Sequence, residues 1–247
     1  MSLLHIVRKM LRTLGVDLVR YSHTSHPAAR KMHFMNATDI NLVLDVGANI
    51  GQYAFEIRSA GYTGKIVSFE PLSEAYVVLD SKVKKDINWS AYNIAMGDED
   101  GSADINISQN LHSSSFLNML SKHCAVAPES KYLNKEQVTI KKVDSIIDDI
   151  SRLEDRIFLK IDAQGFEKKV LNGALGSFDR IEMILIEVAL VPLYEGETLF
   201  FEMNDFLYKF GYCLVAIDPP EFVDPVTGEI LQVNATYRKV RKEIDIK

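Results

Sequence analysis

The sequence has few of the residues that reinforce small or extracellular folds. Its 247 residues include only two cysteines, Cys124 and Cys213, whose spacing fits neither a disulfide framework nor a metal site. This content favours a reducing compartment. Seven prolines and thirteen glycines are too few for a collagen-like or linker-like chain. Hydrophobic residues make up 47% of the chain, enough for a full core at this length, so we expect a globular protein with one large domain.

Long apolar runs are also absent. The longest, Ile181–Leu190, is interrupted by Glu182 and Glu187 and is far shorter than the ~20 residues that cross a membrane. At the N-terminus, basic residues alternate with apolar ones, whereas in a secretory signal peptide they precede an apolar block. We therefore expect a cytoplasmic protein without a transmembrane segment.

Positive charge is scarce beyond the first thirty residues. The net charge is −6, but residues 1–31 carry six Lys/Arg and one acid, whereas the rest of the chain carries 22 basic and 33 acidic side chains. Broad nucleic-acid binding requires a basic face. We therefore expect no nucleic-acid partner.

The basic N-terminus has the pattern of an amphipathic helix from Leu3 to Leu14, and Gly15 would end it. Such a helix would pack on the main domain or on a partner subunit of a homo-oligomer. The alternative is a basic helix lying on a membrane surface. Residues 22–33 are polar and indicate a linker or loop. The sequence thus divides into a helix with linker, 1–38, and a main domain, 39–247.

From Leu42 onward, short apolar runs alternate with helical patterns, which predicts βαβ units and a parallel sheet. The expected strands are 42–44, 65–69, 89–95, 157–161 and 181–188, and the helices between and after them are 52–60, 73–84, 167–175 and 199–210. Between the third and fourth strands we expect alternating strands at 102–108 and 138–143, a long loop with a short helix at 111–130, and a helix at 146–150 capped by Asp144 and Ser145. The last strands, 212–217 and 235–240, are expected to form a hairpin.

The turn Asp45–Gly51 follows the first strand and opens a helix. Such a turn lets a ligand approach backbone N–H groups. A dinucleotide fingerprint G-x-G-x-x-G that started at Gly47 would need glycines where Asn49 and Gln52 stand, so NAD binding is not supported. Asp45 ends the strand and can meet a cationic amino group, such as that of S-adenosylmethionine (SAM).

Two further acids follow the next strands. Glu70 ends the second strand, where a carboxylate can accept hydrogen bonds from both ribose hydroxyls of an adenosine cofactor; a capping or salt-bridging role is the alternative. Asp98 follows the third strand, where an adenine amino group would find an acceptor. An ordinary turn explains Asp98 equally simply.

The fourth and fifth strands end in Asp162 and Glu187. Asp162 is a candidate general base for an acceptor hydroxyl. Together with Glu187 it could instead form a metal site, although we expect no metal. Glu167 opens the next helix, where its carboxylate suits the helix dipole. Lys160 stands inside an apolar strand, which makes sense only if its amine reaches a carboxylate.

These segments together resemble the FkbM family of SAM-dependent methyltransferases. The matching pieces are Asp45–Gly51, Phe69–Pro71, Asn93–Ala95 with Gly97-Asp98, Ser113–Ser115, Val143–Ile146, Lys160–Glu167, Val170–Ala174, and Glu187 with Pro192–Gly196. They span about residues 40–217. Their order and spacing are more specific jointly than any one of them is alone.

The resemblance implies a Rossmann-like class I methyltransferase fold: a mostly parallel seven-stranded α/β sheet, its last strand antiparallel, with helices on both faces. It implies methyl transfer from SAM to a hydroxyl of a sugar, glycan or natural product. N-methyl transfer and a SAM-binding scaffold without catalysis are the alternatives. The implied cofactor contacts are Asp45, Gly47, Asn49, Gly51, Glu70 and Asp98. The implied acceptor-side residues are Ser113, Ser114, Ser115, Gln164, Glu167 and Tyr194, with Asp162, Glu187 and His112 as catalytic candidates.

Overall fold

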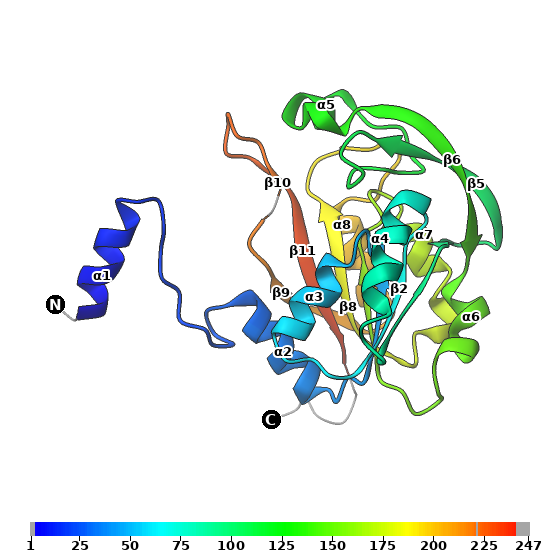
Figure 1. The fold of residues 1–247 in the computed structure, drawn as a ribbon, viewed down its shortest axis with the longest axis horizontal. Coiled ribbons are helices and arrows are strands. Elements are labelled where there is room, and N and C mark those ends of the chain that lie inside the picture. The colour runs from blue at the N-terminus through cyan, green and yellow to red at the C-terminus, as the bar shows by residue number, and fades with distance from the viewer. Residues whose placement is uncertain (1–2, 221, 241–247) are drawn as a thin grey trace.

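A computed structural model describes residues 3–220 and 222–240 (Figure 1). Its centre is a mainly parallel sheet in the order β3–β2–β1–β7–β8–β11, with β9 and the short β10 both on the outer side of β11. The bounds are β1 Leu42–Val46, β2 Lys65–Phe69, β3 Trp89–Tyr92, β7 Ile157–Ile161, β8 Ile181–Ala189, β9 Tyr212–Ile217, β10 Phe222–Val223 and β11 Ile230–Lys239. β11 runs antiparallel to its neighbours. The expected mostly parallel sheet with an antiparallel last strand, and the expected terminal hairpin, are confirmed.

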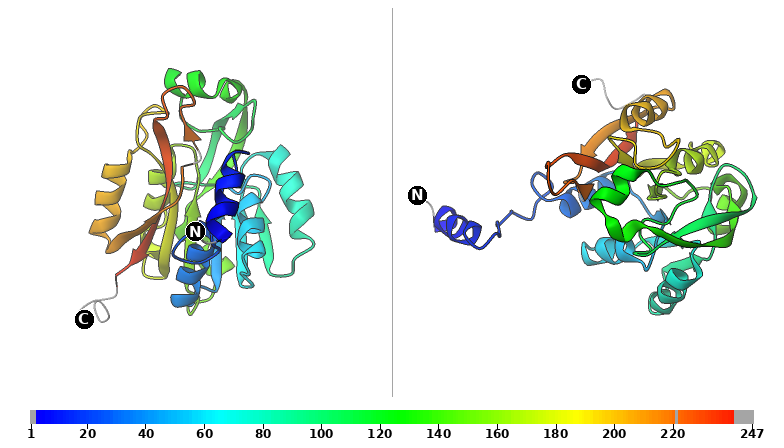
Figure 2. Two further views of the ribbon diagram at one scale, coloured as in Figure 1. Left: turned by 90° about the vertical axis from the view of Figure 1, so that its left-hand side faces the viewer. Right: turned by 90° about the horizontal axis from the view of Figure 1, so that it is seen from above.

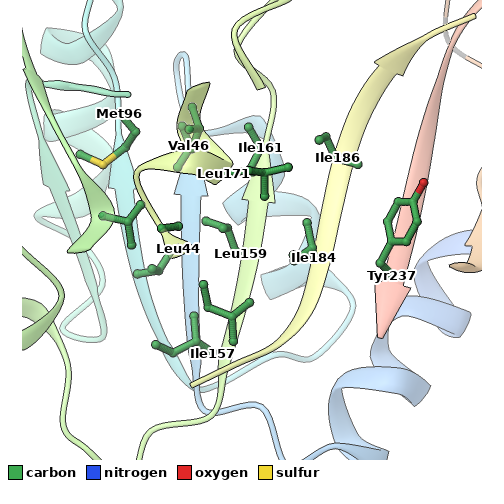
Figure 3. Packing of buried hydrophobic residues seen from close by; sticks show 14 of the residues in the cluster. Leu44, Val46, Met96, Ile157, Leu159, Ile161, Leu171, Ile184, Ile186 and Tyr237 are labelled. Atoms are coloured by element: carbon green, nitrogen blue, oxygen red, sulfur yellow. The ribbon is translucent and has the colours of Figure 1, made fainter. Parts of the chain in front are cut away.

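Helices cover both faces of this sheet because successive strand residues point to opposite sides. On one face, α6 (Val143–Ile150), α7 (Glu167–Asn172) and α8 (Phe200–Lys209) pack against side chains such as Leu44, Leu159 and Ile184. Figure 3 shows part of this core. On the other face, α2 (Pro27–Ala37), α3 (Gln52–Ser59) and α4 (Ser73–Val83) pack against side chains that include Val43 and Phe158.

A second, three-stranded sheet in the order β4–β6–β5 lies beside the carboxyl end of the main one. It consists of β4 (Ala95–Met96), β5 (Gly101–Ser108) and β6 (Tyr132–Lys141). The loop between β5 and β6 contains α5 (Ser121–Val126) and a 3-10 turn at Pro128–Ser130, and it arches over the same end (Figure 1). The predicted long loop with a short helix is confirmed.

Several boundaries differ from those expected, including that of β11, which begins at Ile230 and not at residue 235. The strand expected at 89–95 divides between the two sheets, because Asn93 donates its side-chain amide to the carbonyls of Glu70 and Pro71 and bends the chain there. β6 begins six residues earlier than expected. α6 begins at Val143, so Asp144 lies within its first turn and accepts hydrogen bonds from Gly176 and Ser177, in the 3-10 turn Leu175–Ser177.

The N-terminus contains two helices rather than one. α1 (Leu3–Arg12) is confirmed as a helix, but in Figures 1 and 2 it stands apart from the body of the molecule. The linker expected at 22–33 is wrong in its second half, where α2 begins at Pro27. Proline suits the first turn of a helix, and α2 buries Met35 and the stem of Lys31, whose amine pairs with Glu56 at 3.1 Å. The packed body therefore begins near residue 27 instead of residue 39.

Candidate active site

A pocket opens where β1, β2 and β7 end. Its volume, including the space at its open mouth, is about 960 Å³, which is the size of a small-molecule site. Eight of the fifteen predicted site residues line it: Gly47, Asn49, Glu70, His112, Ser114, Asp162, Gln164 and Glu187. Ligands of open α/β sheets bind at this carboxyl edge. We call this cavity the first pocket.

The turn after β1 forms one wall of the first pocket. Gly47 and Asn49 have φ angles of +71° and +47°, a conformation that glycine and asparagine adopt most readily. A Cβ atom at Gly47 would stand 1.8 Å from the carbonyl oxygen of Asp162. Any larger side chain at this position would therefore collide with the end of β7.

Glu70 forms the floor beside this turn. Its Oε2 accepts a hydrogen bond from the Asn49 amide at 2.8 Å, and its Oε1 accepts one from the Leu72 amide at 2.9 Å. Burial raises the pKa of Glu70 to about 7 despite these two bonds. Each carboxylate oxygen has a second lone pair, so Glu70 can hold the turn and still accept bonds from a ligand.

The end of the first pocket beyond Glu70 is apolar. Its walls include Pro71, Met96, Phe116 and Phe166, and the rings of the two phenylalanines are 4.8 Å apart. Such a slot suits a flat aromatic group. Neither phenylalanine was among the predicted site residues, although Phe166 lies within the segment Lys160–Glu167 that resembles the family and Phe116 directly follows the segment Ser113–Ser115.

The opposite end of the first pocket is polar. The Gln164 side-chain amide donates to Asp162 Oδ1 at 2.9 Å and to Glu187 Oε2 at 2.7 Å, and Tyr194 OH donates to Gln164 Oε1 at 2.8 Å. Burial, together with the nearby Asp162 carboxylate, raises the pKa of Glu187 well above its usual value. Asp162, by contrast, keeps 38% of its side chain exposed and is the carboxylate that a ligand can reach.

A second pocket adjoins the first on the far side of Asp162. It shares Gly47, Asn49, His112 and Asp162 with the first pocket. Its other walls are mainly polar or proline residues: Pro27, Lys31, Ala48, Gln52, Tyr53, Glu56, Lys160, Leu185, Asp218, Pro219, Pro220 and Asn234. Asp162 and His112 therefore lie where the two spaces meet.

The model of the family described as "Methyltransferase FkbM domain" matches residues 45–214, well over half of the chain. The chain belongs to the FkbM methyltransferase family. It is thus a methyltransferase, and the sheet described above is that of class I enzymes.

Known proteins similar to this FkbM methyltransferase are distant in sequence. "Methyltransferase 1" of Beauveria bassiana is 21% identical over 198 residues, covering 76% of this chain and 78% of that protein. The structure of methyltransferase FkbM from Methylobacillus flagellatus aligns with a TM-score of 0.49 and 12% identity over 80% of this chain, which spans only 44% of that chain. Precorrin-6y C5,15-methyltransferase from Geobacter metallireducens aligns with a TM-score of 0.44 and 15% identity, covering 86% and 87% of the two chains.

Asp45 does not line the first pocket of this FkbM methyltransferase. It is fully buried, with Oδ1 3.1 Å from the Lys160 amine and Oδ2 3.2 Å from the Ser68 hydroxyl, which also accepts a hydrogen bond from Trp89. Burial lowers the pKa of Lys160, but Asp45 and Asp162 outweigh that effect and leave the pKa above its ordinary value. In this structure Asp45 forms a buried ion pair with Lys160, and its contact with a cofactor amine stays a prediction.

Asp98, Gly51 and Glu167 also lie outside the pocket lining. Asp98 accepts a hydrogen bond from the Lys169 amine at 2.7 Å. Gly51 is the N-cap of α3, where Trp89 leaves no room for a Cβ atom. Glu167 Oε1 accepts bonds from two backbone amides of the loop after β7, and burial raises its pKa to about 8. Of the three, Glu167 supports the pocket, because it holds the loop that carries Gln164.

The serine loop and Tyr194 support the pocket more than they line it. Of the three serines only Ser114 faces the cavity. Ser113 pairs with Ser130, and Ser115 donates to the backbone carbonyl of Gln164 at 2.6 Å. Tyr194 is buried behind Gln164 and orients its amide.

Two features are absent from residues 3–220 and 222–240. Histidine, cysteine, aspartate and glutamate side chains do not gather there in a group of three or more that could hold a metal ion. No helix in those ranges is long and apolar enough to cross a bilayer. Between Asp162 and Glu187, the space a cation would need is taken by the donating amide of Gln164.

Proposed function

We propose that this FkbM methyltransferase uses SAM and transfers the methyl group to a hydroxyl oxygen, with Asp162 as the general base. The observation that best supports this proposal is the position of Asp162. Its partly exposed carboxylate lies at the junction of a pocket suited to an adenosine group and a second, polar pocket. A base at that junction can reach a hydroxyl bound in one pocket while the methyl donor occupies the other.

The first pocket fits the donor in three respects. Glu70 offers free lone pairs to two ribose hydroxyls. The apolar slot beside Phe116 and Phe166 suits adenine. The turn at Gly47 and Asn49 lines the same pocket, where its backbone can contact the rest of the molecule. When bound, SAM supplies a methyl group that is already activated by the positive sulfonium.

The residues around Asp162 fix its direction. Tyr194 holds Gln164, and Gln164 donates to the Asp162 oxygen Oδ1. The Lys160 amine stands 3.6 Å from the other oxygen, Oδ2. These contacts orient the carboxylate, which can accept the proton of the acceptor hydroxyl as the methyl group is transferred. Positioning and deprotonation are the main demands of this reaction.

The second pocket supports a polar acceptor such as a sugar or a glycan end. Gln52, Glu56, Asp218 and Asn234 offer amide and carboxylate groups to hydroxyls, and the Tyr53 ring adds an aromatic wall. Carbohydrate rings combine hydroxyls with apolar C–H faces, and this lining matches both. A natural-product hydroxyl of similar polarity would meet the same groups.

The test is the variant Asp162→Asn, assayed with isotopically labelled SAM against a panel of sugars, glycans, phenols and amines. We expect SAM affinity measured by calorimetry to stay near the wild-type value. The methyl-transfer rate should fall by ~10²–10⁴, the usual contribution of a general base. The control is Asp149→Asn, an exposed aspartate on α6 remote from both pockets, which should change neither quantity.

Other results would replace this proposal with a different one. Transfer only to amines would indicate an N-methyltransferase. SAM binding without transfer to any acceptor class would indicate a scaffold. Near-normal turnover in Asp162→Asn together with loss of turnover in His112→Gln would assign the base to His112, which also lies at the junction of the pockets.

A further inference from the structure

The two sides of α1 differ sharply in chemistry. His5, Arg8, Lys9 and Arg12 follow the spacing i, i+3, i+4, i+7 and so share one side of the helix. The remaining six residues of α1 are apolar, and the helix contains no acid. This division is typical of helices that lie in the interface of a bilayer.

The apolar side of α1 is exposed to solvent. Ile6 and Met10 retain 47% and 66% of their accessible surface, and Leu14, just after the helix, retains 76%. The apolar surface continues along the extended chain to Tyr21, which is also exposed. The right-hand view of Figure 2 shows α1 apart from the body. Packing of this helix on the main domain, one of the expected arrangements, is therefore not what the structure shows.

The charge of this segment is opposite to that of the rest. Residues 3–21 contain Arg8, Lys9, Arg12 and Arg20 against the single acid Asp17, which pairs with Arg8 and Arg12 at 2.9 and 2.7 Å. Residues beyond 31 carry 33 acids against 22 bases. The body would be repelled by an anionic surface, so attraction to such a surface is confined to the N-terminus.

We propose that residues 3–21, the N-terminal arm, dock the protein on an anionic lipid bilayer. The apolar side chains of the arm enter the boundary between head groups and acyl chains, and the basic side chains contact lipid phosphates. Arg8 and Arg12 can exchange part of their contact with Asp17 for phosphate, because all three groups lie at the surface.

A second copy of the chain fits the arm less well. A ten-residue helix is about 15 Å long at 1.5 Å per residue, and its apolar side covers on the order of 150–200 Å². A stable protein interface needs about 800 Å² from each partner. Binding to a bilayer requires no such minimum area of complementary shape. Both the apolar side of the helix and the irregular apolar chain that follows can insert into it.

The test uses the full chain and sedimentation with vesicles. We expect binding to vesicles with roughly 30 mol% phosphatidylglycerol, little binding to pure phosphatidylcholine, and release by high salt, because surface charge attraction is screened. Met10→Asp, which places a charge on the apolar side, should weaken binding at least tenfold. Lys9→Glu should weaken it several-fold, and both variants should keep the wild-type melting temperature.

Val226→Asp is the matched control, because Val226 is 91% exposed on the body. It should bind vesicles like the wild-type chain. Equal binding to neutral and anionic vesicles, or unchanged binding by Met10→Asp, would overturn the proposal. So would a dimer in sedimentation equilibrium that Met10→Asp dissociates while no vesicle binding occurs, since the arm would then contact a second copy.

Discussion

Replacing Lys160 with methionine should destabilise the protein strongly. Lys160 and Asp45 are buried neighbours on adjacent strands, 3.1 Å apart, with exposed fractions of 7% and zero. Methionine fills much of the same volume but carries no charge. The Asp45 carboxylate would then be buried with only the Ser68 hydroxyl as partner. An uncompensated buried charge is among the costliest defects in a folded protein.

The expected loss is about 3–4 kcal/mol of unfolding free energy. Removal of one partner of a buried pair costs about 3–5 kcal/mol, and the remaining bond from Ser68 places this site toward the lower end. Folded domains are stable by only about 5–15 kcal/mol. The variant should therefore keep a folded state at 25 °C but lose a large part of its stability.

Urea unfolding at pH 7 measures this change. With a slope near 3 kcal/mol per molar, the midpoint should fall by about 1 M. Adding Asp45→Asn to the Lys160→Met variant should recover about 2 kcal/mol, because the amide needs no counter-charge. Lys135→Met, at an exposed position of β6, serves as the control. A Lys160→Met midpoint equal to that of the control would refute the ion pair as a source of stability.

Three further predictions concern residues in or beside the first pocket. Gly47→Ala should prevent folding or lower the melting temperature by many degrees, since its methyl group would stand 1.8 Å from a backbone oxygen. In the control Gly101→Ala the added methyl group meets no other atom within 4 Å, so the melting temperature should not change. Burial gives Glu167 a pKa of about 8, above the unfolded value, so the folded state loses stability as pH rises toward 8. In urea unfolding, Glu167→Gln should therefore be more stable than the wild type by at least about 1 kcal/mol at pH 9. Near pH 4 the two proteins should be equally stable. Glu70, with a pKa near 7, should bind SAM more tightly as pH rises from 6 to 8 and release protons on binding; calorimetric heats identical in buffers of different ionisation enthalpy would contradict this.

The main sheet could be predicted closely because its signals are local. Buried parallel strands appear as short apolar runs, and helices follow them with their own period. The observed bounds of β1, β2 and β7 differ from the expected ones by at most two residues. The expected bounds were wrong where a single side chain determines the path of the backbone. Asn93 ends β3 by binding two carbonyls, and α2 is held by the buried stem of Lys31.

The residues that line the pocket could be predicted where their place at the end of a strand fixes their position. Gly47, Asn49 and Glu70 follow β1 and β2 directly, and the carboxyl-edge rule alone places them at the cavity. Tyr194 and Ser115 were placed beside a substrate, but they act through Gln164. Their distance from Gln164 along the sequence hides that contact, which only the folded loops create.

Strand register explains why Asp45 pairs with Lys160 inside the sheet. In the parallel pairing of β1 with β7 and β2, Asp45 stands directly beside Lys160 on one side and Ser68 on the other. Directly paired residues point to the same face of a sheet. An acid at the end of one strand and a lysine inside another apolar strand can therefore form a cross-strand ion pair. This pairing should be considered before a ligand role is assigned to the acid. Here that pair ties β1 to β7 two residues before the point where Gly47 meets Asp162, so the contact that buries Asp45 also helps to hold the pocket's two walls together.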